Sequence, residues 1–305
     1  MEIRRSILSV PGHIDKMHIK ASTCQADVIM FDLEDSVPLD LKKKARETVV
    51  QSIRSLDWSN KLVSIRVNAI DTPYAYEDVI FCVEHCGSVI RSIVLPKVNH
   101  EGDIHFLDRL LLGIERNLHF QKTVSIEASI ETASGLERIR EISSSVSRLK
   151  SLVFGIADYT ASIGAPLTSL SGHGDDRDRL SPGQRWHYVL SRIVMTAKSN
   201  NLYAIDAPYG NFTDEKGLRE SASTSRLLGF DGKWVIHPDQ IATVNDVYSP
   251  SDAEIERAKQ IIEIHHKALS KGRGAASEKG SMVDSATLRL AEKIWSLAVQ
   301  LGKVE

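Results

Sequence analysis

Two acidic residues at the ends of apolar runs are the first candidates for chemistry. Glu131 ends the run 125–131, and Asp158 ends the run 151–158. If the runs are neighbouring parallel strands, the two carboxylates can share one hard cation. The alternative is that each acid caps the next helix, which is the better explanation for either acid alone. The pair, together with Arg66 at the end of another run, favours a metal site.

Ionisable and amide side chains recur where other apolar runs end. Asp and Asn at such places often cap helices, so part of this set is structural. A set drawn from so many separate runs is difficult to explain by capping alone. Its members are Asp32, Glu34, Asp35, Arg66, Asn68, Lys97, Glu131, Asp158, Asp206 and His237.

The apolar runs alternate with helical patterns, which predicts an α/β fold with a parallel sheet. Eight strands are the number that closes a TIM (β/α)8 barrel, whose active sites lie at the carboxyl ends of the strands. A doubly wound open sheet is the alternative, but the turn Val10-Pro11-Gly12-His13 is not the glycine-rich phosphate turn expected there. The predicted strands are 6–10, 27–33, 62–67, 90–95, 125–131, 151–158, 202–206 and 234–236.

The barrel is predicted to occupy residues 1–248, and residues 249–305 to form a C-terminal helical appendage. Ser251 can cap a helix to about Lys271, a glycine-bearing turn follows, and a last helix begins near Ser285. Two helices cannot form a core alone, so the appendage must dock as a lid on the barrel or on another subunit. The polar stretch 164–183 is either a loop over the site or a disordered insertion.

Composition excludes several classes of protein. The chain has 305 residues, 42% of them hydrophobic, and a formal net charge of −2, so no general basic field indicates nucleic acid. No apolar run is long enough to span a membrane, and no secretory signal is visible, which predicts a cytoplasmic protein. Cys24, Cys82 and Cys86 do not form a disulfide framework, and His85 alone does not complete a zinc site.

Short motifs distributed over essentially the whole chain carry a family resemblance. They are Arg5-Ser6 with Val10-Pro11-Gly12, Asp32-Leu33-Glu34-Asp35-Ser36-Val37, Arg66-Val67-Asn68, Leu95-Pro96-Lys97, Ile130-Glu131-Thr132-Ala133, Phe154-Gly155 with Asp158, Gly229-Phe230-Asp231-Gly232-Lys233, Ile236-His237-Pro238, and Met282-Val283-Asp284. In this order they resemble the citrate lyase β-subunit group of the HpcH/HpaI aldolase/citrate lyase superfamily. The run 204–210 and the triplets Ala157-Asp158-Tyr159 and Ile236-His237-Pro238 are more similar to its malyl-CoA, β-methylmalyl-CoA and citramalyl-CoA lyases.

The resemblance implies roles for individual residues. Glu131 and Asp158 would bind Mg²⁺, and Arg66 would hold the carboxylate of the small acid. Asp284 would transfer a proton, often into the site of a neighbouring subunit, so a homo-oligomer (trimer or hexamer) is expected. Ala157, Ile236 and His237 would contact substrate. On chemical grounds, Glu34 and Asp35 would orient Arg66 or metal-bound water, although a structural role for them is nearly as good an explanation.

The implied reaction is cleavage of a 3-hydroxy-acyl-CoA that bears a carboxylate, giving acetyl-CoA or propionyl-CoA with glyoxylate or pyruvate. Two negative charges develop when the C–C bond breaks, so two stabilising groups are needed. Asp284 would protonate the enolate carbon, although its spacing alone indicates a helix cap. The alternatives are a citrate lyase β subunit acting on a citryl carrier protein, a malyl-CoA thioesterase, and a silent binding protein. The intact residues Arg66, Glu131, Asp158 and Asp284 argue against the last.

Overall fold

The chain forms two compact units in the computed structural model, which describes residues 2–166, 185–270, 276–278 and 281–304. One unit is Arg4–Asn245, and the other is Asp246–Glu305 with the first three residues. The division lies within helix α10, near the predicted boundary after residue 248. Each unit is described by itself below.

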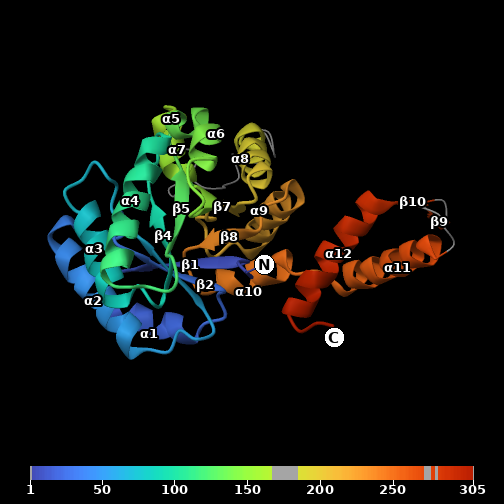
Figure 1. Cartoon of the computed structure of the whole chain (residues 1–305), viewed down its shortest axis with the longest axis horizontal. Helices are drawn as coiled ribbons and strands as arrows, with labels where there is room; N and C mark the ends of the chain where they lie inside the picture. Colours follow the sequence, from blue (N-terminus) through green and yellow to red (C-terminus); the bar gives the residue numbers. More distant parts are fainter. Residues whose placement is uncertain (1, 167–184, 271–275, 279–280, 305) are drawn as a thin grey trace. The chain divides into compact units, whose positions relative to one another are not determined.

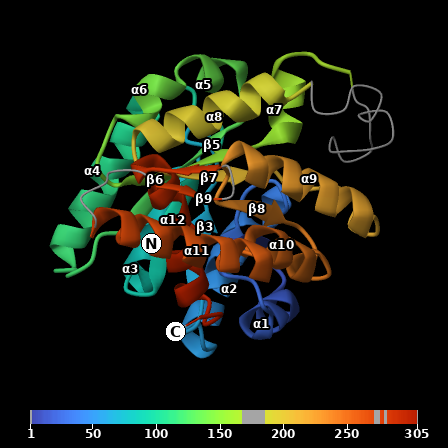
Figure 2. The ribbon, with the colours of Figure 1, turned by 90° about the vertical axis from the view of Figure 1, so that its right-hand side faces the viewer.

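The first unit is a closed barrel of eight parallel strands in the order β1 to β8, with β8 paired to β1. The TIM-barrel prediction is confirmed, and Figure 2 shows helices on all sides of the strands. The strands are β1 (Ser6–Pro11), β2 (Val28–Asp32), β3 (Leu62–Arg66), β4 (Ile90–Leu95), β5 (Ser125–Ile130), β6 (Leu149–Phe154), β7 (Tyr203–Asp206) and β8 (Gly232–Val235).

Helices connect successive strands, as a right-handed parallel barrel requires. Several begin at side-chain caps that the sequence carries: Thr132 accepts from the Gly135 amide, and Asp214 accepts from the Gly217 amide. The helices up to the division are α1 (Asp15–Thr23), α2 (Lys42–Ser55) after a short 3₁₀ turn (Leu39–Leu41), α3 (Ala75–Cys86), α4 (Glu101–Asn117), α5 (Ala133–Glu137), α6 (Ile139–Ser143), α7 (Ile156–Ser162), α8 (His187–Ser199), α9 (Glu215–Leu228) and the first part of α10 (Gln240–Tyr248).

The segment after Thr132 forms two short helices, because Arg138 between them has φ −96° and ψ 18°, outside the α region. One expectation about the strands was wrong in detail. The sixth strand ends at Phe154 instead of continuing to Asp158, so Asp158 lies in the first turn of α7. The polar stretch predicted at 164–183 lies outside the described residues from 167 onward.

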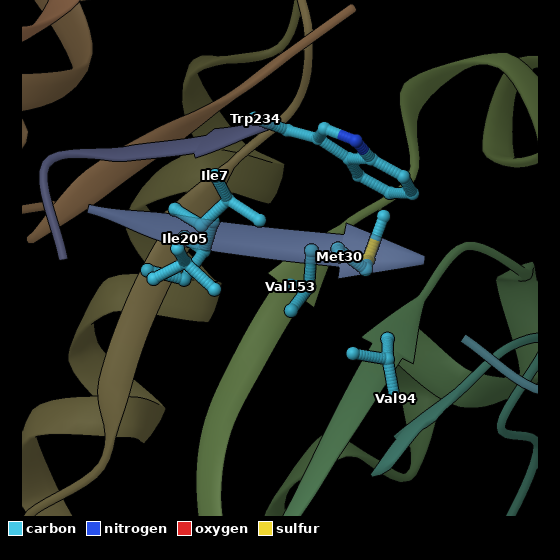
Figure 3. Close-up of a cluster of buried hydrophobic side chains, with 7 residues drawn as sticks. Ile7, Met30, Val94, Val153, Ile205 and Trp234 are labelled. Carbon is cyan, nitrogen blue, oxygen red and sulfur yellow. The ribbon is translucent and has the colours of Figure 1, made fainter. Parts of the chain in front are cut away.

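Apolar side chains fill the barrel interior. Figure 3 shows a cluster of them converging from different strands. Next to this cluster, at the level where Glu127 pairs in register with Val94, is a buried polar group. In it, Glu127 Oε1 accepts from Arg4 Nη2 and from Ser92 Oγ, each at 2.5 Å. A buried charge needs such a partner. The cluster consists of Ile7, Val28, Met30, Val94, Val153, Ile205 and Trp234.

The second unit is built on two packed helices, α11 (Asp252–Leu269) and α12 (Ser285–Gln300), labelled in Figure 1. A capping box joins Ser251 and Glu254 at the start of α11, as the sequence predicts. Strands β9 (Ala276–Glu278) and β10 (Ser281–Val283) form an antiparallel pair between the helices. The glycine-bearing turns at 272–274 and at Gly280 lie outside the described residues, and the lid function stays a prediction.

In the described part of the chain, no helix is long and apolar enough to cross a membrane. The three cysteines are free thiols; Cys82 and Cys86 are buried on α3, and Cys24 is half-buried.

Candidate active site

Glu131 lies directly after β5 at the carboxyl end of the barrel and is only 1% exposed. The backbone amide of Lys97, which follows β4, donates to Glu131 Oε1 at 2.6 Å. Space for the carboxylate comes from Gly155 after β6, where an added Cβ would lie 2.0 Å from Glu131 Oε2. The glycine in the Phe154-Gly155 motif therefore leaves the space that the Glu131 carboxylate occupies.

Asp158 stands beside this acid on a neighbouring segment. Ile130 of β5 pairs with Phe154 of β6, so the two strands end at the same level of the barrel. Burial raises the pKa of Glu131 to about 8, and the charges of Glu34 and Asp158 act in the same direction against that of Arg66. Negative charge is therefore crowded around Glu131.

Lys97 lies among these acids. Its Nζ is 2.5 Å from Glu34 Oε1, 3.4 Å from Asp35 and 3.8 Å from Asp158 Oδ1. Burial opposes its charge, but the Glu34 hydrogen bond and the acids around it raise the pKa of the Lys97 ammonium above its usual value. One side chain thus contacts three of the acids that the sequence places at this end of the barrel.

Arg66 ends β3 and is 7% exposed. Its Nε and Nη2 donate to the two carboxylate oxygens of Asp32, each at 2.7 Å, and its Nη1 is 3.1 Å from Glu34 Oε2. Its guanidinium carbon lies 5.0 Å from the centre of the Trp234 ring. Since arginine has five N–H donors, donors remain for a substrate carboxylate.

Glu34 and Asp35 have different surroundings. Glu34 is buried and contacts both Arg66 and Lys97, whereas Asp35 is exposed and contacts only Lys97 among the interactions of this site. Burial raises the pKa of Glu34, and the charge of Arg66 opposes that rise. Glu34 is placed to orient Arg66; Asp35 is not.

The other predicted strand-end residues fall into two groups. Asp206 forms a buried ion pair with Lys233 at 2.5 Å, and Asn68 donates to Asp78 Oδ2 at 2.6 Å, so both are structural. Ile236 and Ala157 are exposed, whereas His237 is half-buried. Ile236 and His237 follow β8, and Ala157 lies in the first turn of α7. The His237 ring stacks on Phe212 with 4.7 Å between ring centres.

Asp284 belongs to the second unit and is the N-cap of α12. Its Oδ1 accepts from the backbone amides of Ala286 and Thr287 at 3.0 and 2.9 Å, and from the Thr287 hydroxyl at 3.0 Å. These hydrogen bonds lower the pKa of the half-exposed Asp284 carboxyl. The capping explanation is thus correct as geometry, and the proton-transfer role stays a prediction. Of the two residues before Asp284, Val283 is buried, whereas Met282 is 67% exposed.

The donor set fits a hard divalent cation. Within the described ranges, no group of three or more His, Cys, Asp or Glu side chains is arranged as metal ligands. Mg²⁺ is commonly held by only one or two carboxylates, with water and substrate oxygens completing its shell. Glu131 and Asp158 would supply two such oxygens in an acid-rich surrounding, and the absence of a side chain at Gly155 leaves space for Glu131.

Three contributions were not recognised from the sequence alone. Asp32 and Lys97 were noted at strand ends without a role, and Gly155 was noted only as part of a motif. A signal was present for Lys97, because it follows Pro96 immediately after an apolar run. The contacts of Asp32 and Gly155 join different strands and leave no local signal.

Comparison with known proteins identifies the family of the chain. Residues 5–238 match the family model HpcH/HpaI aldolase/citrate lyase. An L-malyl-CoA/beta-methylmalyl-CoA lyase of Cereibacter sphaeroides is 37% identical over 93% of this chain and 91% of its own length. A citrate lyase subunit beta of Leuconostoc mesenteroides subsp. cremoris is 33% identical over 97% of this chain and 93% of its own length.

Solved structures give the same result. The CitE protein of Mycobacterium tuberculosis, in complex with magnesium, acetoacetate and coenzyme A, has a TM-score of 0.75 and 26% identity, covering 97% of this chain and 98% of that one. A citrate lyase of Burkholderia xenovorans LB400 shares the fold, with a TM-score of 0.85, 18% identity, and coverage of 99% and 93% of the two chains. The chain therefore belongs to the HpcH/HpaI aldolase/citrate lyase family and is a carbon–carbon lyase.

Proposed function

We propose that this enzyme cleaves, or forms, a 3-hydroxy-dicarboxylic acyl-CoA such as malyl-CoA, β-methylmalyl-CoA or citramalyl-CoA with the help of Mg²⁺ or Mn²⁺. The products of cleavage are acetyl-CoA or propionyl-CoA and glyoxylate or pyruvate. The observation that carries the proposal is the crowding of Glu131, Asp158 and Glu34 beside Arg66 at the carboxyl ends of the strands. The 37% identity to L-malyl-CoA/beta-methylmalyl-CoA lyases supports this substrate class.

In the proposed reaction, acidic residues bind the metal and a basic residue binds negative charge on the substrate. Glu131 and Asp158 hold the metal, which when bound supplies a Lewis acid for the hydroxyl and carboxylate oxygens of the substrate. Arg66 directs its remaining N–H donors at a substrate carboxylate or at developing negative charge. Glu34 and Asp32 keep the guanidinium in place. The exposed side chains of Ala157 and Ile236 and the half-buried ring of His237 contact the rest of the substrate.

A proton must reach the carbon that becomes the methyl or methylene group of the product acyl-CoA. We assign this step to Asp284, whose carboxylate is half-exposed and whose Oδ1 carries the cap hydrogen bonds, so that Oδ2 is the oxygen for the proton. A carboxyl in this role donates the proton in cleavage and removes it in condensation. The assignment includes a homo-oligomer, trimer or hexamer, in which the acid serves a neighbouring subunit.

Chelation tests the proposal directly. Purified enzyme is incubated with malyl-CoA, β-methylmalyl-CoA and citramalyl-CoA, and the products are identified by mass spectrometry. We expect excess EDTA to abolish turnover, Mg²⁺ to restore it, and Glu131→Gln to resist restoration. Full turnover in EDTA would show that the reaction needs no metal. Release of free malate from malyl-CoA without glyoxylate would show that the enzyme is a thioesterase and not a lyase.

A citrate lyase β subunit is the second candidate, favoured by the 33% identity to such a subunit. It would use the same residues on a citryl thioester of a carrier protein. Acetyl carrier protein and oxaloacetate as products from the carrier-bound substrate, with no reaction of the CoA esters, would establish it.

A further inference from the structure

Lys97 is held in an unusual backbone conformation at the centre of the acidic site. Its φ is +51°, in the left-handed region that non-glycine residues seldom adopt. Of the described residues, only His119 and Asn201 share this feature outside glycine. His119 follows the end of α4 and Asn201 follows the end of α8, whereas Lys97 follows a barrel strand at the site, where a strained backbone often has a functional reason.

The conformation allows one residue to contact the acids by two routes. The Lys97 backbone amide donates to Glu131 at 2.6 Å, while its ammonium donates to Glu34 at 2.5 Å and stands 3.8 Å from Asp158. Both proposed metal ligands are thus bound or faced by the same lysine. The ammonium is a permanent positive charge among carboxylates that a divalent cation also has to approach.

We propose that Lys97 is a positioning residue that holds the acidic cluster together without metal and weakens the binding of the divalent cation. This inference rests on the proposed metal site of Glu131 and Asp158. The lysine charge replaces part of the metal charge in the free enzyme, so the carboxylates stay in place instead of repelling one another. When the cation binds, the nearby ammonium repels it, which keeps the metal exchangeable.

The other charged groups around Lys97 are three acids and one arginine. Glu34, Asp35 and Asp158 face its ammonium, and Arg66 contacts Glu34 from the other side. Arg66 is also held by Asp32, so it cannot move into the position of the lysine. Removal of the Lys97 charge therefore leaves the acids around it less compensated.

The test is a titration with Mn²⁺, whose free concentration is measured by electron paramagnetic resonance, on the full-length protein. The variants are Lys97→Met, which removes the charge, and Lys97→Asn, which removes it with a residue that tolerates a positive φ. Lys198→Met is the matched control, because Lys198 has a similarly exposed side chain, 36% against 31%, and pairs with Asp231 ahead of β8 at the other end of the barrel. Glu131→Gln marks the site.

We expect both Lys97 variants to bind Mn²⁺ about tenfold more tightly than the wild type, since the positive charge 3.8 Å from the proposed ligand Asp158 is removed. In EDTA the same variants should melt at a lower temperature than the wild type, and saturating Mn²⁺ should remove most of that difference. Lys198→Met should bind Mn²⁺ as the wild type does. Tighter binding distinguishes this role from a merely structural one, which would leave the metal affinity unchanged or weaken it.

Two contrary results have different meanings. If the wild type binds Mn²⁺, Glu131→Gln does not, and both Lys97 variants bind with unchanged or lower affinity, the role of Lys97 is overturned while the metal site stands. If the wild type does not bind Mn²⁺, or if Glu131→Gln binds it equally well, the proposed metal site fails and the inference about Lys97 fails with it.

Discussion

Asp32 and Arg66 form a bidentate ion pair across neighbouring strands, with Nε and Nη2 of the arginine each 2.7 Å from a carboxylate oxygen. The two residues are directly paired in register, at the ends of β2 and β3. Both are buried, and the planar guanidinium also lies over Trp234. The arginine at the site is therefore fixed in orientation before any substrate arrives.

Replacement of Arg66 by Lys should keep the charge but lose the two-pronged contact with Asp32. We expect kcat/KM for the acyl-CoA substrate to fall about 100-fold or more, as for the loss of a donor to developing charge. Steady-state kinetics measure it. Arg5→Lys is the matched control, because Arg5 Nε and Nη2 make the same kind of contact with Asp27, at 2.9 and 2.7 Å, ahead of β1 and β2. If the two variants lose activity equally, Arg66 has no special role.

Acid should weaken the barrel through Asp32. Burial alone would raise the pKa of this carboxyl, but the charge and hydrogen bonds of Arg66 outweigh burial and lower the pKa to about 2. Because the pKa of Asp32 is lower in the folded than in the unfolded protein, ionised Asp32 stabilises the fold. This stabilisation is complete above about pH 4 and is lost as the pH falls toward 2. We expect about 2 kcal/mol of the free energy of unfolding to disappear in this window.

Urea unfolding of the wild type and of Asp32→Asn from pH 6 to pH 2.5 measures this loss. The variant should be less stable at neutral pH by about 3–5 kcal/mol, because Arg66 loses its charged partner. Below pH 4 its stability should change less with pH than that of the wild type. The same pH dependence in both proteins would show that Asp32 does not contribute in this way.

Gly155→Ala should disable the site without straining the backbone at that position. Gly155 has φ −105°, which is not in the left-handed region that favours glycine. The added Cβ would lie 2.0 Å from Glu131 Oε2 and 2.5 Å from Glu131 Cβ, so Glu131 must move. We expect affinity for Mn²⁺ and kcat each to fall at least about tenfold. Gly113→Ala is the control, since nothing lies within 4 Å of its added Cβ on α4. Unchanged metal affinity in Gly155→Ala would show that the position of Glu131 does not matter.

Asp284→Asn separates the cap from the acid. Asparagine caps helices as well as aspartate, so we expect the melting temperature to change little while turnover falls at least about 100-fold. Thr287→Val is the opposite control, because it removes a hydroxyl that donates to Asp284 at 3.0 Å but keeps the acid. Thr287→Val should keep its turnover. Near wild-type turnover of Asp284→Asn would reduce Asp284 to a helix cap.

Mixing inactive variants tests whether the acid serves another subunit. Asp284→Asn and Arg66→Lys are mixed under conditions in which labelled subunits are shown to exchange. If sites are shared between chains, some mixed sites contain an intact Arg66 and an intact Asp284, and activity should return in part. No recovery after proven exchange would assign Asp284 to its own chain's site.

The order of elements could be read from the sequence because it depends on local patterns. Apolar runs such as 90–95 form buried strands wherever they pack, and caps such as Ser251 with Glu254 act within one turn. The boundary at Asp158 was misjudged because the apolar residues 155–157 suit the end of a strand and the start of a helix equally well. Propensity cannot choose between these states; packing does.

The candidate site shows the same division more sharply. The sequence determined that acids and an arginine follow separate strands, and the barrel rule brought them to one end. Only the tertiary structure decided which of them are in contact. Asp32 binds Arg66, and Lys97 lies between Glu34 and Asp158. Asp206 forms an ion pair with Lys233 and contributes nothing to this cluster. These contacts depend on strand register and on the direction of each side chain. Both are set when distant segments pack together and are not encoded within any one segment.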